Sequence, residues 1–213
     1  MFGTGTLSEE QFDAGFPYPA AVGVPCRVLG SPAVGEDDEV VTVAVLPERG
    51  HGPEVRVRRR QLDAAEPVLV SACLAGVPCR YDGRARTSEA AVGLVEDGRA
   101  VVVCPEVAGG LATPRPAAEI VGGDGADVLD GRARVVDATG ADCTEAFLDG
   151  ARQALAAAEA AGARRALLMA RSPSCGCGQV YDGSFGGTLR AGDGVTAALL
   201  RRAGVVVTAG QAG

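Results

Sequence analysis

From Val68 onward, short apolar runs alternate with helical patterns, and this alternation restricts the possible folds more than any other feature. The apolar runs cover residues 68–72, 100–103, 165–170 and 205–208. The helical patterns cover residues 87–97, 144–161 and 193–203. Short runs rich in Val and Leu are typical of strands that are buried on both faces of a parallel sheet. We therefore predict an α/β fold with an open parallel sheet and helices on both faces, in a Rossmann-like three-layer arrangement.

Residues 1–66 have a different pattern and are expected to form a separate unit. Three β-prone runs occur at residues 21–29, 40–46 and 54–59. Segments rich in turn-forming residues separate these runs, which predicts a small all-β unit that resembles an SH3 fold. The expected boundary lies near Pro67, so the chain divides into residues 1–66 and an α/β domain at residues 67–213.

Composition and charge exclude several classes of protein. The chain of 213 residues contains no lysine, which excludes Schiff-base catalysis through a lysine. Its net charge of −7 is the opposite of the basic balance expected of a nucleic-acid-binding protein. The Gly-rich stretches contain neither the Rossmann dinucleotide fingerprint nor a P-loop. We also expect no membrane span and no signal peptide.

Three of the seven cysteines occur at or shortly after the end of a predicted strand. They are Cys73, Cys104 and Cys175, and each lies where a Gly- or Pro-containing loop begins. Because the carboxyl ends of parallel strands converge on one crevice, we predict that these thiols meet there. The Pro- and Gly-rich segment 104–125 is interpreted as a long loop, and loops of this length are usually functional. An odd number of cysteines without a disulfide layout favours reduced thiols and a cytoplasmic location.

Converging thiolates usually bind a metal ion or a cluster, and a missing fourth ligand leaves an open coordination position. Zinc normally recruits four ligands, often in Cys-x-x-Cys pairs, and the chain contains no such pair. The single histidine, His51, lies in a turn of the N-terminal unit and is more typical of a surface residue. The pattern favours an iron–sulfur cluster over zinc. Three buried packing residues remain the alternative, because free cysteine is among the most often buried residue types.

The other cysteines have less distinctive surroundings. Cys26 and Cys143 are interpreted as packing residues. Cys79 and Cys177 each lie close in sequence to a strand-end cysteine. Each is therefore a candidate for a fourth ligand, a sulfur relay or a redox partner, or is simply an unused thiol.

Polar residues near these thiols are candidates for proton transfer and hydrogen bonding. Glu106, two residues beyond Cys104, is a candidate general acid–base. The alternative is an exposed or salt-bridged loop carboxylate. Ser172 and Ser174 can donate hydrogen bonds to a bound anion or to a cluster sulfur, or they satisfy the backbone of their turn.

A short turn occurs twice, each time a few residues beyond a strand-end cysteine. Its copies are Tyr81-Asp82-Gly83 and Tyr181-Asp182-Gly183. Asp-Gly is above all a turn signal. We predict that two similar loops wall the cleft, which makes Tyr81 and Asp82 candidate substrate contacts.

Taken together, these motifs closely resemble the thiouracil desulfidase family of bacteria and archaea. The matching segments are Ser71–Gly76 with Cys79–Gly83, Cys104–Glu106 with Gly109–Arg115, and Ser172–Gly176 with Tyr181–Phe185. The resemblance covers about residues 67–210 and says nothing about residues 1–66. It departs from the family pattern at Met169, where many relatives are expected to have a lysine.

The resemblance implies a single α/β domain with a [4Fe–4S] cluster on Cys73, Cys104 and Cys175. It also implies non-redox removal of sulfur from thiouracil or a related thiolated pyrimidine, which yields uracil and sulfide. In this hypothesis water attacks the C=S carbon while Glu106 carries the proton. Ser172, Ser174 and Arg115 are expected to orient the pyrimidine or to stabilise negative charge.

Other functions stay open on the sequence alone. One alternative is desulfuration of thiouridine in RNA, against which the acidic balance argues. Another is a non-catalytic sulfur- or metal-handling protein in which Cys79 or Cys177 carries a persulfide, and a third is a structural zinc protein. The expected partners are a small thiolated base and the machinery that assembles clusters.

Overall fold

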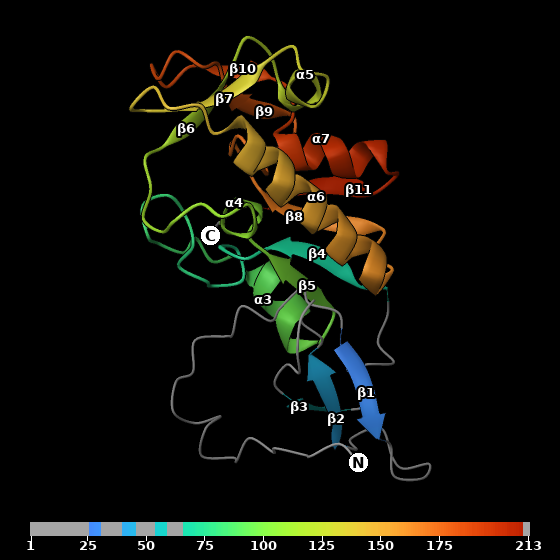
Figure 1. The fold of residues 1–213 in the computed structure, drawn as a ribbon. Coiled ribbons are helices and arrows are strands. Elements are labelled where there is room, and N and C mark those ends of the chain that lie inside the picture. Colours follow the sequence, from blue (N-terminus) through green and yellow to red (C-terminus); the bar gives the residue numbers. More distant parts are fainter. Residues whose placement is uncertain (1–25, 31–39, 46–53, 59–65, 211–213) are drawn as a thin grey trace.

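Four parallel strands form the central sheet of the molecule (Figure 1). The structure, a computed structural model, describes the backbone of residues 26–30, 40–45 and 54–58 and the whole of residues 66–210. The strands are β4 (Val68–Ser71), β5 (Ala100–Val103), β8 (Arg165–Met169) and β11 (Val206–Gly210). Their order is β11-β8-β4-β5, with Val68 opposite both Ala100 and Arg165. The predicted α/β fold with a parallel sheet is therefore confirmed.

Helices pack against this sheet from two sides. They are α3 (Glu89–Glu96), α6 (Thr144–Ala161) and α7 (Val195–Arg202). Figure 1 shows α6 and α7 above the sheet and α3 below it. Successive residues of β4 divide between two cores, because side chains alternate along a strand. Leu69 belongs to the core that contains Ala154 and Leu200, whereas Val70 belongs to the core that contains Ala91.

Helix α6 spans the residues that the apolar periodicity of the sequence predicts to be helical. Phe147, Ala151 and Ala154 are buried along one face. The helix ends at Gly162, whose φ of 69° is the left-handed conformation that favours glycine. The helix begins at Thr144 as predicted, with Cys143 as its N-cap, and the Asp142 carboxylate accepts a hydrogen bond from the Thr144 amide.

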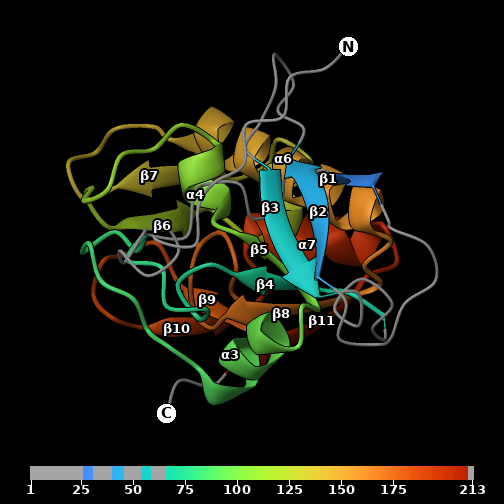
Figure 2. The ribbon, with the colours of Figure 1, turned by 90° about the horizontal axis from the view of Figure 1, so that it is seen from below.

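The segment 104–125, interpreted as one long loop, contains regular structure, and this corrects the sequence prediction. It includes α4 (Pro105–Ala108) and β6 (Ala118–Val121). Beyond it lie α5 (Gly125–Leu129) and β7 (Arg134–Asp137), and a second hairpin contains β9 (Gln179–Tyr181) and β10 (Leu189–Ala191). Figures 1 and 2 show the antiparallel pairs β6–β7 and β9–β10 at one end of the molecule. Elements of three to five residues are too short to produce a readable periodicity.

The N-terminal strands are β1 (Cys26–Gly30), β2 (Val40–Val45) and β3 (Glu54–Arg58). They form an antiparallel sheet in the order β1-β2-β3, in agreement with the three predicted β-prone runs. The SH3-like fold and the domain boundary near Pro67 stay predictions. His51 lies outside the described residues, and the side chain of Cys26 is not described. Among the described residues, no helix combines the length and apolarity required to cross a membrane.

Two glycines allow α4 to lie directly against α6. A Cβ atom on Gly150 would overlap the carbonyl oxygen of Pro105, and one on Gly109 would overlap the carbonyl oxygen of Ala146. The backbones of the two helices are therefore in contact. This contact determines the position of α4, whose N-terminal residues are Pro105 and Glu106 and whose N-cap is Cys104.

Replacing Gly150 by alanine is expected to destabilise the protein by about 1–3 kcal/mol, because the added methyl group pushes α4 away from α6. Gly93→Ala in α3 is the matched control, since its Cβ would meet nothing within 4 Å. That control should stabilise the protein by roughly 0.5–1 kcal/mol, the ordinary gain for glycine to alanine inside a helix. Urea unfolding measures both free energies. Equal changes in the two variants would show that the α4–α6 contact is not tight.

Candidate metal centre

Thiols from three different loops lie together beyond the ends of the parallel strands. Cys73 is in the turn that follows β4, and Cys104 is the N-cap residue of α4, directly after β5. Cys73 and Cys79 belong to one buried cluster, against which the partly buried Cys104 packs. The Cys104 thiol donates a hydrogen bond to the Cys79 carbonyl oxygen at 3.8 Å, which places these two residues in contact. Cys79 therefore lies with two of the strand-end cysteines.

Cys175 approaches this group from the far side of the central strands. It is buried in the core between the sheet and α6–α7, and its thiol interacts electrostatically with that of Cys104. The Ser71 hydroxyl at the end of β4 lies beside the Cys175 thiol and lowers its pKa. The same Ser71 oxygen accepts a hydrogen bond from the Met169 amide at 2.9 Å, which ties β4 to β8 at this point. Sequence reasoning missed Ser71, which has no signal apart from its place two residues before Cys73.

The surroundings of the thiols favour their neutral forms. Burial raises the pKa of the Cys175 thiol to about 12, although the hydrogen bond from Ser71 opposes the shift. The hydrogen bond to Cys79, together with burial, raises the pKa of Cys104. For Cys79, the bond with Cys104 lowers the pKa, but the bond with Cys73 and burial outweigh it and raise the pKa to about 12. Buried thiols of this kind can charge only when a cation replaces their protons.

This set of donors fits an iron–sulfur cluster. Its members are all thiols, they come from separate loops, and the site contains no histidine. Thiolates are the ligands that such clusters use. In the part of the chain that the structure describes, no three His, Cys, Asp or Glu side chains surround a single ion position.

The turn that carries Cys175 is held by its own hydrogen bonds and by α7. The Ser172 hydroxyl oxygen accepts hydrogen bonds from the amides of Ser174 and Cys175, at 3.0 and 3.1 Å. The carbonyl oxygens of Pro173 and Ser174 accept hydrogen bonds from the first amides of α7. The Ser174 hydroxyl is fully buried, 2.8 Å from the hydroxyl of Thr196. Ser172 thus lies on the side of the turn that faces Glu106, whereas Ser174 faces α7.

Glu106 is the carboxylate beside the thiols. One of its oxygens, Oε2, accepts a hydrogen bond from Nε of Arg115 at 2.9 Å and lies 2.8 Å from Nη2 of the same side chain. Its other oxygen, Oε1, accepts a hydrogen bond from the Ser172 hydroxyl at 3.3 Å. Glu106 is therefore the salt-bridged residue of one sequence interpretation, and it also faces the turn of Cys175. A cavity of about 30 Å³, lined in part by Glu106, Arg115 and Cys143, opens next to it.

Comparison with known proteins identifies the family to which the chain belongs. The sequence profile described as 2-thiouracil desulfurase matches residues 68–211, which is most of the chain and the whole site. The chain belongs to the 2-thiouracil desulfurase family. It is similar to the uncharacterized protein YbbK of Bacillus subtilis (strain 168), at 50% identity over 137 residues, which are 64% of this chain and 91% of YbbK.

A solved structure is also similar to this member of the desulfurase family. It is described as a [4Fe-4S]-dependent thiouracil desulfidase, TudS. The two chains are 47% identical, with a TM-score of 0.60, over 68% of this chain and 91% of TudS. The resemblance seen in the sequence motifs is therefore confirmed for the α/β part of the chain.

The repeated turn has the same local geometry in both places in this desulfurase. Asp82 accepts a hydrogen bond from the amide two residues later, and Asp182 does the same. The glycine of each copy has a positive φ, 71° and 89°, which a side chain would strain. The Tyr81 ring is 45% exposed and packs against the Arg80 guanidinium, to which Asp82 is also paired. Contact of Tyr81 or Asp82 with substrate stays a prediction.

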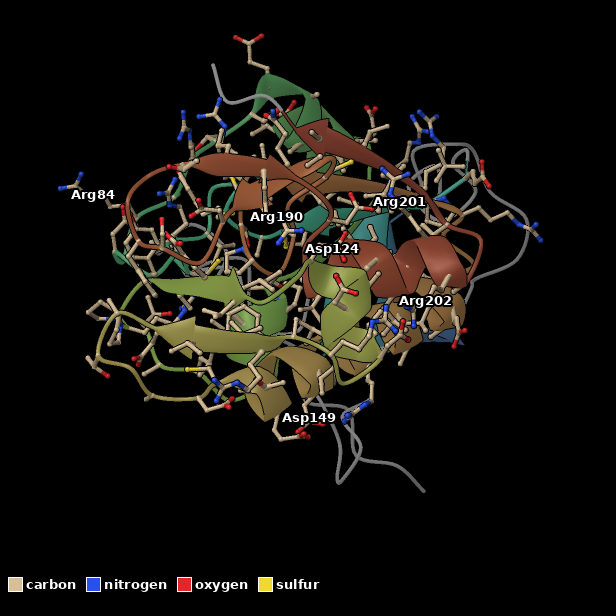
Figure 3. All side chains as sticks on the ribbon, turned by 90° about the horizontal axis from the view of Figure 1, so that it is seen from above. Arg84, Asp124, Asp149, Arg190, Arg201 and Arg202 are labelled. Carbon is tan, nitrogen blue, oxygen red and sulfur yellow. The ribbon has the colours of Figure 1, made fainter. Side chains whose placement is uncertain are left out.

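Two further cysteines have other partners. The Cys177 thiol accepts a hydrogen bond from Arg201 of α7, labelled in Figure 3, and itself donates to the Val207 carbonyl oxygen. Cys143 lies at the start of α6, and its thiol donates to the carbonyl oxygen of Ala141. Neither belongs to the cluster that contains Cys73 and Cys79 and against which Cys104 packs. Met169, the departure from the family pattern, packs against both cores.

Proposed function

We propose that Cys73, Cys104 and Cys175 hold a [4Fe–4S] cluster with which the enzyme removes sulfur from thiouracil. The enzyme is an iron–sulfur-dependent thiouracil desulfidase. The observation that supports the ligand assignment is that Cys73 and Cys104 pack in one cluster, with Cys175 close enough to interact electrostatically with Cys104, in a chain of the desulfurase family. The supporting fold is the Rossmann-like three-layer arrangement, in which the three loops leave one edge of the sheet.

The reaction exchanges the sulfur of a thiocarbonyl for the oxygen of water. Thiouracil and water give uracil and hydrogen sulfide, so atoms balance and no electrons are transferred. A [4Fe–4S] cluster on three thiolates supplies an iron with a free coordination position, a Lewis acid for the thiocarbonyl sulfur. The residues of the chain must then position water and move its protons.

Glu106 is placed to carry the proton. Its Oε1 faces the Ser172 hydroxyl, whereas its Oε2 is occupied by Arg115. Water that attacks the thiocarbonyl carbon loses a proton, and the carboxylate is the base nearest to the thiols. That proton passes to the departing sulfide, and Glu106 then transfers the hydroxyl proton of the tetrahedral adduct to the sulfide in the same way, so that uracil and hydrogen sulfide form and Glu106 returns to its starting state. General acid–base catalysis of this kind typically contributes about 10²–10⁴-fold to a rate.

The serines of the Cys175 turn have different roles in this proposal. Ser172 donates a hydrogen bond from its hydroxyl group to Glu106 and accepts hydrogen bonds from two amides, so it orients both the carboxylate and the turn. Ser174 holds the turn against α7 through Thr196. Tyr81 and Asp82 belong to a loop that reaches Arg115 through the Tyr81 carbonyl oxygen, and we propose that this loop borders the substrate.

A small thiolated base is the substrate that suits this molecule best. The net charge of −7 does not favour a nucleic-acid partner, which argues against thiouridine in RNA. Assembly of the cluster by dedicated machinery and a cytoplasmic location stay parts of the proposal.

An anaerobic turnover experiment without any reductant tests the proposed function. Cluster-loaded protein and 2-thiouracil should give uracil and sulfide in equal amounts, and uracil formed in heavy-oxygen water should carry the label. A requirement for reductant would rule out hydrolytic desulfuration. Uracil that forms in labelled water without taking up the label, under conditions in which its carbonyl oxygen does not exchange with water, would also rule it out.

A further inference from the structure

Arg115 is the most extensively bonded side chain of the site. It lies between α4 and β6, and its side chain is only 7% exposed. Its Nε and Nη2 contact Oε2 of Glu106, and Nη2 also donates to the Cys79 carbonyl oxygen at 3.1 Å. Nη1 donates to the Ala112 carbonyl oxygen and to the Thr113 hydroxyl, at 3.0 and 3.1 Å. Four of these contacts are hydrogen bonds, and the approach of Nη2 to Oε2 at 2.8 Å is an ion pair.

The four hydrogen bonds use four of the five N–H donors of the guanidinium, and the remaining donor is on Nη2, which lies 2.8 Å from Oε2 of Glu106. A hydrogen bond to a pyrimidine would require the side chain to give up one of its protein partners inside a largely buried site. Contact of Arg115 with substrate stays a prediction. The contacts in the structure point to a role that acts through the groups that Arg115 already holds.

The pairing with Glu106 is asymmetric. Both nitrogens of Arg115 that contact the carboxylate do so at Oε2, whereas Oε1 has only the 3.3 Å contact with Ser172. The guanidinium is itself fixed by the Cys79 loop and by residues 112–113. A carboxylate held at one oxygen by a rigid donor can present only the other oxygen to water. Charge-assisted contacts of this kind are short and strong, so the orientation persists.

We propose that Arg115 is a positioning residue that anchors Oε2 of Glu106 and so makes Oε1 the proton-carrying oxygen. The amide of Arg115 also donates to the Tyr81 carbonyl oxygen, so one residue joins the Cys79–Tyr81 loop to the carboxylate. The inference rests on the proposed desulfidase function and adds a residue that orients its base. Lysine would be a poor replacement, because a single ammonium group cannot reproduce the planar set of contacts.

A double-mutant cycle tests the proposal in cluster-loaded protein. The four proteins are wild type, Arg115→Gln, Glu106→Gln and the double variant. If Arg115 acts through Glu106, Arg115→Gln lowers kcat by about 10²-fold, and it lowers kcat less than about twofold further when Glu106 is already Gln. KM for 2-thiouracil and the Kd for uracil should change by less than about threefold, since Arg115 does not contact the base. Arg132→Gln, at an exposed arginine paired with Asp127 and Asp130, is the matched control and should retain wild-type values.

Each other result overturns the positioning role. Independent, additive losses of kcat, or a Kd for uracil raised about tenfold with kcat retained, would make Arg115 a separate or substrate-binding residue. Arg115→Lys, measured in the same cycle, replaces the glutamine variant if the latter does not fold. Loss of iron from both Arg115 variants would show that Arg115 holds the thiol loops rather than Glu106, which also contradicts the proposal.

Thermal unfolding of the same proteins separates this inference from the proposed function. If the changes in melting temperature caused by the Arg115 and Glu106 substitutions are not additive, the two side chains interact, and this measurement requires no turnover. If the iron-loaded wild type is inactive but the melting temperatures show coupling, the desulfidase function is contradicted and the pairing of Arg115 with Glu106 is not. If the wild type is active but neither kcat nor the melting temperature shows coupling between Arg115 and Glu106, only the positioning role is contradicted.

Discussion

Cys175→Ala is expected to yield protein with little bound iron and with desulfidase activity reduced to background. Cys175 is 5% exposed in the core below α6 and α7, and its amide donates a hydrogen bond to Ser172. Loss of one of three thiolates removes a covalent bond to the cluster. Iron and acid-labile sulfide assays after anaerobic purification measure the loss, and uracil formation measures the activity.

Cys177→Ala is the matched control, because it removes a thiol two residues away in the same loop. That thiol is bonded to Arg201 and to the carbonyl oxygen of Val207, not to the other thiols of the site. Iron content and kcat should remain at wild-type levels. If the two variants lose iron equally, or if Cys175→Ala keeps its cluster and full activity, the assignment of Cys175 as a ligand is wrong.

Glu106→Gln is expected to keep the cluster and to lose about 10²–10⁴-fold in kcat. The amide has nearly the shape of the carboxylate and can still bond to Ser172, but it cannot accept a proton from water at neutral pH. Because Arg115 keeps a neutral acceptor, the fold and the thiol loops should persist. Iron content, melting temperature and kcat distinguish the loss of the base from the loss of structure.

Glu145→Gln at the exposed start of α6 is the control for removal of a single negative charge. It should leave kcat unchanged. A Glu106 variant with wild-type kcat would show that another group, or water alone, carries the proton. Equal losses of iron and of activity would instead assign Glu106 to cluster retention.

The parallel sheet and the strand-end thiols could be predicted from the sequence because each depends on a strong local pattern. Buried runs such as Val68–Ser71 are continuous in apolar residues, and a cysteine at the end of such a run must lie at the edge of the sheet. The long helix α6 has enough turns for its apolar face to be read with correct bounds. Short elements such as α4 and β6 are formed by tertiary contacts, among them the glycine contact of α4 with α6.

Within the site, residue types were easier to predict than partners. Nothing in the sequence indicates that the Arg115 side chain donates hydrogen bonds to Glu106, Cys79 and Thr113 rather than to a ligand. These partners depend on the path of the chain between α4 and β6. Likewise, Cys79 has no strand before it that would place it beside Cys104. Its position results from the turn after β4, where its carbonyl oxygen meets both Arg115 and the Cys104 thiol.

The iron and sulfide content of anaerobically purified protein tests the central claim most directly. A [4Fe–4S] cluster on Cys73, Cys104 and Cys175 predicts brown protein with about four iron and four sulfide per chain. Addition of 2-thiouracil to that protein should then release uracil. Colourless protein with one zinc per chain, from cells supplied with iron, would contradict the cluster and the function built on it.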